Sequence, residues 1–211
     1  LGREGATLCG ACDLSPKAFR MYRSMGIRVP FCTDVNEAVE RFAPDGAIVA
    51  TPAAMHLPLA ELLSEKNIPV LVEKPLSIVP SAGQDWLALR AAHPGAVIHS
   101  GYMAAQYPHL EYARQLLEGG SLGRVRGVWA FSLQAHIMAS HPVRWEMEKA
   151  KSGGGALLNF GSHVLSMLMR LFGEPISFDA RMWPIHSSQV EDAIETRLAW
   201  PGFEGRFMAS W

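Results

Sequence analysis

The chain has 211 residues, of which 49% are hydrophobic and 18% charged, a composition typical of a globular protein with one large or two small domains. The formal net charge of −1, with no basic run interleaved with aromatic residues, argues against binding to nucleic acid or to an anionic membrane surface. No apolar run approaches the roughly 18 residues that a membrane span needs, so the sequence favours small-molecule chemistry.

The cysteines Cys9, Cys12 and Cys32 are odd in number and provide no disulfide framework, which favours a reducing compartment and a cytoplasmic protein. Cys9 and Cys12 have CxxC spacing. Because residues three apart in a strand point to opposite faces, their sulfur atoms would not converge. Core cysteines are therefore the preferred interpretation over zinc or redox chemistry, and no metal site is expected.

The first hundred residues alternate short apolar strands with helices. Helix starts are marked by Ser15-Pro16 and by capping-box spacing at 34–37 and 81–84. Strands alternating with helices predict βαβ units and a parallel sheet. The expected elements are strand 6–13, helix 16–25, helix 34–42, strand 47–50, helix 57–66, strand 68–72, helix 81–93 and strand 97–99.

The pattern changes from Gly101 onward. Three glycines at 153–155 precede a long helical pattern, and the chain then reads as successive strands. Runs of strands after a helix predict a second α+β domain with a large open, mainly antiparallel sheet. The expected elements are helix 108–118, strand 124–133, helix 155–172, and strands 178–183, 192–200 and 203–211.

Lys74 follows the apolar strand 68–72, and open α/β sheets place their ligand crevice at the carboxyl ends of strands. A lysine in that position can bind and exchange a proton. Glu73 can hold its ammonium by a charge-assisted hydrogen bond, and Pro75 fixes the backbone direction. The alternative interpretation is a solvated strand-end lysine.

Asp13 ends a strand just before a helix. In a dinucleotide-binding fold, an acid there binds the 2′-hydroxyl of the adenosine ribose and favours NAD over NADP. The alternative is an ordinary turn aspartate. The phosphate-binding glycine pattern belongs about 20 residues earlier, and the segment 2–5 does not match it.

Helix 155–172 carries one polar stripe beside a wide apolar surface. A solvated face would normally carry Lys and Glu, whereas this stripe carries an amide, hydroxyls and an imidazole. Asn159 and His163 lie one turn apart, and a histidine can transfer protons near neutral pH. The stripe consists of Asn159, Ser162, His163, Ser166 and Arg170.

Several of these segments, in this order and spacing, resemble the Gfo/Idh/MocA family, which includes glucose-fructose oxidoreductase and inositol dehydrogenase. The resemblance implies a Rossmann-type domain over 1–100, without its first strand and glycine loop, and a substrate and dimerisation domain over 101–211, incomplete at its C-terminal end. The segments are the strand ending in Asp13, Thr51-Pro52 with His56, Val72-Glu73-Lys74-Pro75-Leu76, Gly101-Tyr102, Gly119 to Gly123 and Gly153 to His163.

The same resemblance implies a nicotinamide cofactor, NAD with NADP as the alternative, a sugar, cyclitol or related polyol as substrate, and a homo-oligomer, dimer or tetramer, assembled through the C-terminal sheet. Lys74 would bind the reacting hydroxyl or carbonyl and help move its proton, and His163 would be the acid/base or substrate-binding histidine. The residues implied at the cofactor are Asp13, Thr51, Pro52, His56, Glu73 and Lys74.

Two positions depart from the family pattern. Asn159 stands where the family commonly has aspartate, and an amide can orient a hydroxyl but cannot accept its proton. Segment 103–106 stands where the family usually has an arginine-containing pattern.

The leading hypothesis is a dehydrogenase or reductase acting on CH–OH groups. The alternatives are a non-catalytic NAD(P)- or sugar-sensing protein and an NAD-dependent glycoside hydrolase. A parent protein longer at both ends is expected, and the fragment alone should bind NAD poorly because it lacks the pyrophosphate cradle.

Overall fold

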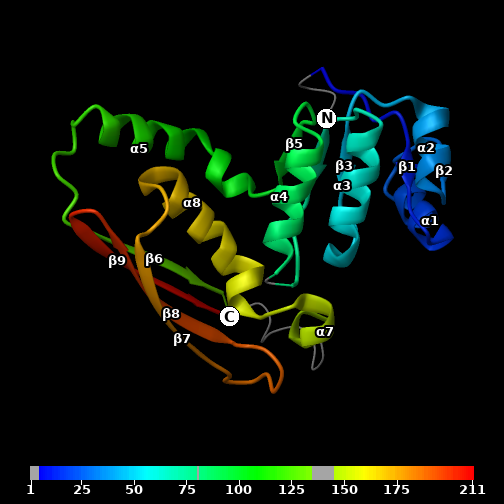
Figure 1. The fold of residues 1–211 in the computed structure, drawn as a ribbon. Coiled ribbons are helices and arrows are strands. Elements are labelled where there is room, and N and C mark those ends of the chain that lie inside the picture. The colour runs from blue at the N-terminus through cyan, green and yellow to red at the C-terminus, as the bar shows by residue number, and fades with distance from the viewer. Residues whose placement is uncertain (1–4, 80, 135–144) are drawn as a thin grey trace.

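The structure, a computed structural model, describes residues 5–79, 81–134 and 145–211 (Figure 1). In Figure 1 the short parallel strands and helices α1–α4 lie on one side of the molecule, and the sheet of β6 to β9, covered by α8, lies on the other. None of the described helices is both long and apolar enough to cross a membrane.

Within its described residues, the N-terminal half contains five short strands and alternating helices. Its elements are β1 (Ala11–Cys12), α1 (Pro16–Ser24), β2 (Phe31–Cys32), α2 (Val35–Phe42), β3 (Ala47–Val49), η1 (Ala53–Met55), α3 (His56–Glu65), β4 (Val70–Val72), α4 (Ala82–Ala92) and β5 (Ile98–Ser100). All strand pairs here are parallel, in a two-stranded sheet β1-β2 and a three-stranded sheet β3-β4-β5, which confirms the expected fold class.

Helix starts in this half follow the local sequence in two of three cases. Ser15 caps α1 and Asp34 caps α2, where its Oδ1 accepts the Glu37 N–H at 2.9 Å. The capping box expected at Ser81 is wrong, because its side chain makes no cap bond to α4. Packing of α3 and α4 on the strands, with Leu63 and Leu89 buried, stabilises that helix region instead.

The first strand is much shorter than expected. The prediction of strand 6–13 is wrong over most of its length, since only Ala11 and Cys12 pair with a neighbour. The core assignment is also wrong for Cys9 and Cys12, which are exposed, whereas Cys32 is buried. Strand β2, which the sequence pattern did not predict, provides the partner for β1.

The C-terminal half contains a mixed sheet with strand order β6-β9-β8-β7. Strand β6 pairs parallel with β9, and the other two pairs are antiparallel. The elements are η2 (Met103–Gln106), α5 (Pro108–Glu118), β6 (Gly127–Leu133), η3 (Trp145–Met147), α7 (Lys149–Ser152), η4 (Leu157–Gly161), α8 (Ser162–Phe172), β7 (Ser177–Trp183), β8 (Ala193–Trp200) and β9 (Phe203–Ser210).

One face of this sheet packs against α8 and the turn before it. Inward side chains alternate along β8 and β9, and Phe207 and Ile194 are almost fully buried under Leu168 of α8. Fully burying one such side chain stabilises the fold by about 1.5–3 kcal/mol. The sheet therefore fixes the helix that carries the polar stripe.

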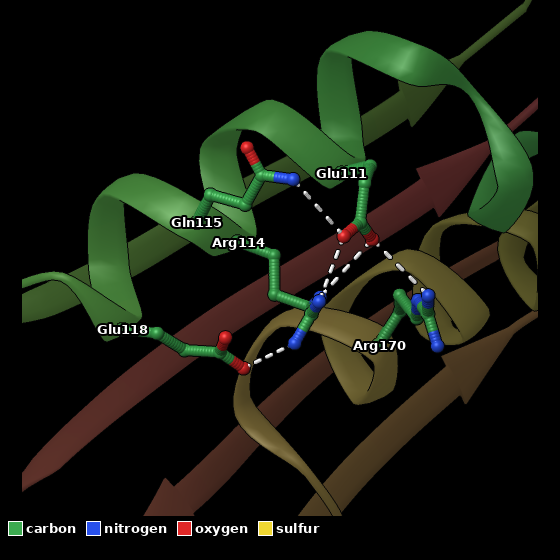
Figure 2. A network of polar contacts seen from close by, with 5 residues as sticks. All are labelled: Glu111, Arg114, Gln115, Glu118 and Arg170. Carbon is green, nitrogen blue, oxygen red and sulfur yellow. Dashed lines mark hydrogen bonds and ion pairs between the residues drawn. The ribbon is translucent and has the colours of Figure 1, made fainter.

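An ion-pair network on the surface ties α5 to α8 (Figure 2). Glu111 binds Arg114 at 2.7 Å and Arg170 of α8 at 3.1 Å, while Arg114 also pairs with Glu118. The hydrogen bond from Arg114 lowers the pKa of Glu111 to about 2. This network holds α5 against the far end of α8.

Candidate active site

The carboxyl ends of three neighbouring strands form the edge on which the site is built. Val49, Val72 and Ser100 are register partners across β3, β4 and β5. The ladder continues one residue further, because Glu73 N–H donates to the Val49 carbonyl and Gly101 N–H donates to the Val72 carbonyl. Residues that follow the three strands, including Thr51, Lys74 and Tyr102, are consequently brought to one edge.

Lys74 reaches from this edge to the C-terminal half. Its Nζ donates to the backbone carbonyl of Asn159 at 2.9 Å and lies 3.3 Å from the Asn159 Oδ1. The ring of Phe160 lies 6.0 Å from the same ammonium. Glu73, expected to bind the ammonium, instead accepts the backbone N–H of Lys74 at 3.1 Å.

Asn159 lies in a π-helical turn, η4, that precedes α8. Such turns interrupt the regular i→i−4 bonding of a helix and are frequent at functional sites. The expected single helix 155–172 is therefore divided in two, with the change of geometry at the residue that contacts Lys74. Both the carbonyl and the amide of Asn159 face the ammonium.

His163 stands one turn further along, in α8, and packs against Tyr102. The edge of one ring faces the other, with ring centroids 5.9 Å apart and an interplanar angle of 79°. The Nδ1 atom of His163 is buried and has no hydrogen-bond partner within the part of the chain that the structure describes. Tyr102 belongs to this group of side chains, although the sequence pattern assigned it no individual role.

Burial shifts the pKa values of Lys74, His163 and Tyr102. Partial burial lowers the pKa of Lys74, an effect that the nearby Glu73 carboxylate opposes. Burial, followed by repulsion from Lys74, lowers the pKa of His163. Burial raises the pKa of Tyr102 against a hydrogen bond with Ser162. Near neutral pH the site therefore contains a neutral imidazole beside a lysine that gives up its proton more readily than usual.

The cofactor-side residues implied by the sequence lie at strand ends. Asp13 follows β1, and its Oδ1 accepts the Ser15 N–H at 2.7 Å. Thr51 and Pro52 follow β3 and are exposed. Thr51 therefore leaves an exposed hydroxyl, and Asp13 a partly buried carboxylate, after the carboxyl ends of parallel strands.

His56 takes a different place. It is only 1% exposed, its Nδ1 lies 2.9 Å from the Pro75 carbonyl oxygen, and its Nε2 lies 2.8 Å from the Thr51 carbonyl oxygen. Both ring nitrogens are thus engaged by the backbone. His56 joins the turn after β3 to the backbone beside Lys74.

Glu191 is a residue of this region that sequence reasoning missed. Its two carboxylate oxygens accept the N–H groups of Gly155 and Leu157 at 2.9 and 3.1 Å. The contact joins residues more than 30 positions apart, in a turn between two strands, so no local pattern signals it. It lies at the start of the helical segment that carries Asn159 and His163.

Two surface hollows lie outside the Lys74 edge. One, of about 510 Å³, lies between Gly153–Leu158 and the turn that contains Glu191, and the other, of about 430 Å³, lies on the outer sheet face. Neither is lined by Lys74 or His163. Within the described residues, no group of three or more His, Cys, Asp or Glu side chains is arranged to hold a metal ion.

The chain has a parallel-strand half with a lysine at the carboxyl edge of its sheet, followed by a mixed-sheet half that supplies an amide and an imidazole. This arrangement is that of a two-part α/β protein of the dinucleotide-binding class. Residues 2–102 match the family model described as an oxidoreductase family with an NAD-binding Rossmann fold, and residues 110–211 match the one described as the GFO/IDH/MocA C-terminal domain. The chain belongs to the GFO/IDH/MocA family of oxidoreductases.

Similar proteins are named for sugar chemistry. Levoglucosan dehydrogenase of Pseudarthrobacter phenanthrenivorans is 28% identical over 60% of this chain and 32% of its own length. The dTDP-3,4-didehydro-2,6-dideoxy-alpha-D-glucose 3-reductase of Streptomyces antibioticus is 29% identical over 61% of this chain and 38% of its own.

A solved structure shows the same fold over almost the whole chain. The oxidoreductase domain protein from Kribbella flavida is 27% identical, with a TM-score of 0.85, over 96% of this chain and 58% of that chain. This chain spans less than half the length of each of these two curated relatives.

Proposed function

We propose that this chain provides the cofactor edge and proton-transfer groups of an NAD(P)-dependent dehydrogenase or reductase that acts on a CH–OH carbon of a sugar, cyclitol or related polyol. The observation that carries the proposal is the meeting of Lys74 with Asn159, one helical turn from His163, at the carboxyl edge of a parallel sheet. The names of the relatives support the substrate class.

Each side chain has a distinct task in this proposal. Lys74 binds the reacting oxygen and takes its proton in the oxidative direction, because burial lowers its pKa. His163 lies beside it as a second proton-transfer group, and Asn159 orients a substrate hydroxyl without accepting its proton. Tyr102 packs against His163 and limits its rotation.

The cofactor side is assigned to Asp13, Thr51 and Pro52. A carboxylate at Asp13 favours the free ribose hydroxyl of NAD over the 2′-phosphate of NADP. The nicotinamide supplies the redox chemistry when bound, and the protein supplies binding, orientation and proton transfer. His56 is buried and supports the same edge through its contacts with the Thr51 and Pro75 carbonyl oxygens.

The test is a binding titration followed by a turnover screen. NADH and NADPH are added to the full-length parent protein and their binding is followed by tryptophan fluorescence, and levoglucosan, D-xylose and inositol are then offered with NAD⁺ and NADP⁺. We expect tighter binding of NADH than of NADPH, and turnover that Lys74→Ala reduces strongly without loss of fold. Normal turnover in Lys74→Ala would contradict the assignment.

A non-catalytic sensor is the second candidate, favoured by the amide of Asn159 where a carboxylate would accept protons. Dinucleotide binding without turnover of a broad polyol panel would support it. Release of a free sugar without net NADH would instead support a glycoside hydrolase that oxidises its substrate transiently.

The outer face of the four-stranded sheet is the surface proposed for self-association. Trp129, Phe131 and Leu133 of β6 are 77%, 63% and 61% exposed and stand in one row. Beside them, Glu195 and Arg206 offer both signs of charge, so two copies of this face are complementary to each other. Replacing Trp129 by glutamate should shift a dimer or tetramer to smaller species in sedimentation; an unchanged distribution would place the interface elsewhere.

A further inference from the structure

The helical segment that carries Asn159 and His163 begins with N–H groups that no preceding helical turn can satisfy. The N–H groups of three consecutive residues at its start bind one residue, Glu191. The carboxylate accepts the N–H groups of Gly155 and Leu157, and the Glu191 backbone carbonyl accepts the Ala156 N–H at 3.0 Å. A negative group at a helix N-terminus also interacts favourably with the helix dipole.

The approach of the two segments is unusually close at Gly155. A Cβ atom at that position would lie 1.8 Å from the Glu191 carbonyl oxygen, well inside any allowed contact. Only glycine therefore fits, and the position of the segment relative to Glu191 is set by backbone contact as well as by the carboxylate.

Glu191 is itself held firmly by its neighbour. The buried Asp192 accepts the N–H groups of Ile185, His186 and Ser187 with one oxygen, and the indole N–H of Trp211 with the other. These bonds fasten the turn before β8 to the sheet. Glu191 therefore transmits the position of the sheet to the start of the helical segment.

We propose that Glu191 is a positioning residue that sets the placement of Asn159 and His163 relative to Lys74. A single residue, Leu158, separates Leu157, which Glu191 holds, from Asn159, whose carbonyl oxygen binds the Lys74 ammonium. The segment is thus fixed from the sheet on one side and from the parallel strands on the other. This inference rests on the proposed function for its catalytic consequence, but its structural part does not.

The test compares Glu191→Ala and Glu191→Gln with a control, Glu174→Gln, in the full enzyme. Glu174 is exposed, just past the other end of the same helix. Hydrogen exchange over residues 155–163 and an NMR titration of the His163 imidazole are measured. We expect Glu191→Ala to speed exchange at least about ten-fold and to raise the pKa of His163, because the helix start frays and the imidazole gains water.

Turnover of levoglucosan, D-xylose and inositol with NAD⁺ is measured on the same variants. A small displacement of a catalytic group costs up to about 100-fold, so kcat should fall about 10- to 100-fold in Glu191→Ala while NADH affinity is nearly unchanged. Glu191→Gln retains one acceptor oxygen and should restore part of kcat and of the exchange protection.

The measurements distinguish a positioning role of Glu191 from a purely structural one. A lower melting temperature with unchanged His163 titration and kcat would mean that Glu191 only stabilises the fold, and would overturn the proposal. If Glu191→Ala does not fold, the same measurements are made on Glu191→Gln. Hydrogen exchange and His163 titration in Glu191→Gln that match wild type would then overturn the proposal. A wild-type enzyme that turns over none of the sugars counts against the proposed function, while the exchange and titration data still decide the role of Glu191.

Discussion

Replacing Asn159 by aspartate should move the pH dependence of turnover upward. The Lys74 Nζ lies 3.3 Å from Asn159 Oδ1, so the substitution sets a full negative charge beside the ammonium. At that separation, the attraction is worth roughly 1 kcal/mol even at the dielectric constant of water. This corresponds to roughly one pH unit, and partial burial of the pair increases it.

The sign follows from the role of the lysine. A raised Lys74 pKa keeps the amine protonated to higher pH, so oxidation, which needs the free amine, loses about ten-fold in kcat/KM near neutral pH. Reduction, which needs the ammonium, stays at its plateau to higher pH. Both profiles therefore shift in the same direction.

The assay is a pH profile of kcat/KM in both directions with whichever sugar the screen identifies. Gln84→Glu, on the exposed face of α4, changes the net charge by the same amount and serves as the control. A profile for Asn159→Asp that stays in place or moves to lower pH, with NADH binding intact, would refute the assignment of Lys74 as the titrating group.

Three further outcomes are expected. Gly155→Ala should prevent folding or leave little soluble protein, because its Cβ would overlap the Glu191 carbonyl, whereas Gly83→Ala, with nothing within 4 Å, should raise the melting temperature slightly. His56→Ala should weaken NADH binding and lower kcat together, measured by fluorescence titration and steady-state kinetics, because both the turn after β3 and the backbone beside Lys74 lose their common anchor. Since the pKa of Glu111 is lowered to about 2 from 4.5, its stabilising contribution is complete above about pH 4.5 and is lost as the pH falls toward 2; melting temperatures of wild type and Glu111→Gln should converge over that range.

Apart from β2, the order of strands and helices in the N-terminal half was predictable, because apolar runs and most helix starts are local features of the sequence. So was the placement of Lys74, since a residue after an apolar strand in a parallel sheet must stand at the carboxyl edge. Tyr102 follows from the same rule, since it succeeds β5 as Lys74 succeeds β4. The local pattern failed for strand 6–13, where β-propensity extends well beyond the two residues that find a partner.

The contacts that complete the site were beyond local patterns. The hydrogen bonds of Lys74 with Asn159 and of Glu191 with Gly155 join residues 85 and 36 positions apart. The π-helical turn at Asn159 departs from a periodicity that the sequence continues without interruption. Periodicity gives the face on which a side chain lies, but not its partner in a distant part of the chain.

The bond between the Lys74 ammonium and a main-chain carbonyl has a consequence for how this site can diverge. Any amino acid at position 159 supplies that oxygen, so the anchor of the lysine survives while the side chain is exchanged. Variants at this single position can therefore retune proton affinity or hydroxyl recognition separately from the framework. Variants from a library randomised at position 159 should therefore differ mainly in proton transfer and hydroxyl recognition rather than in folding.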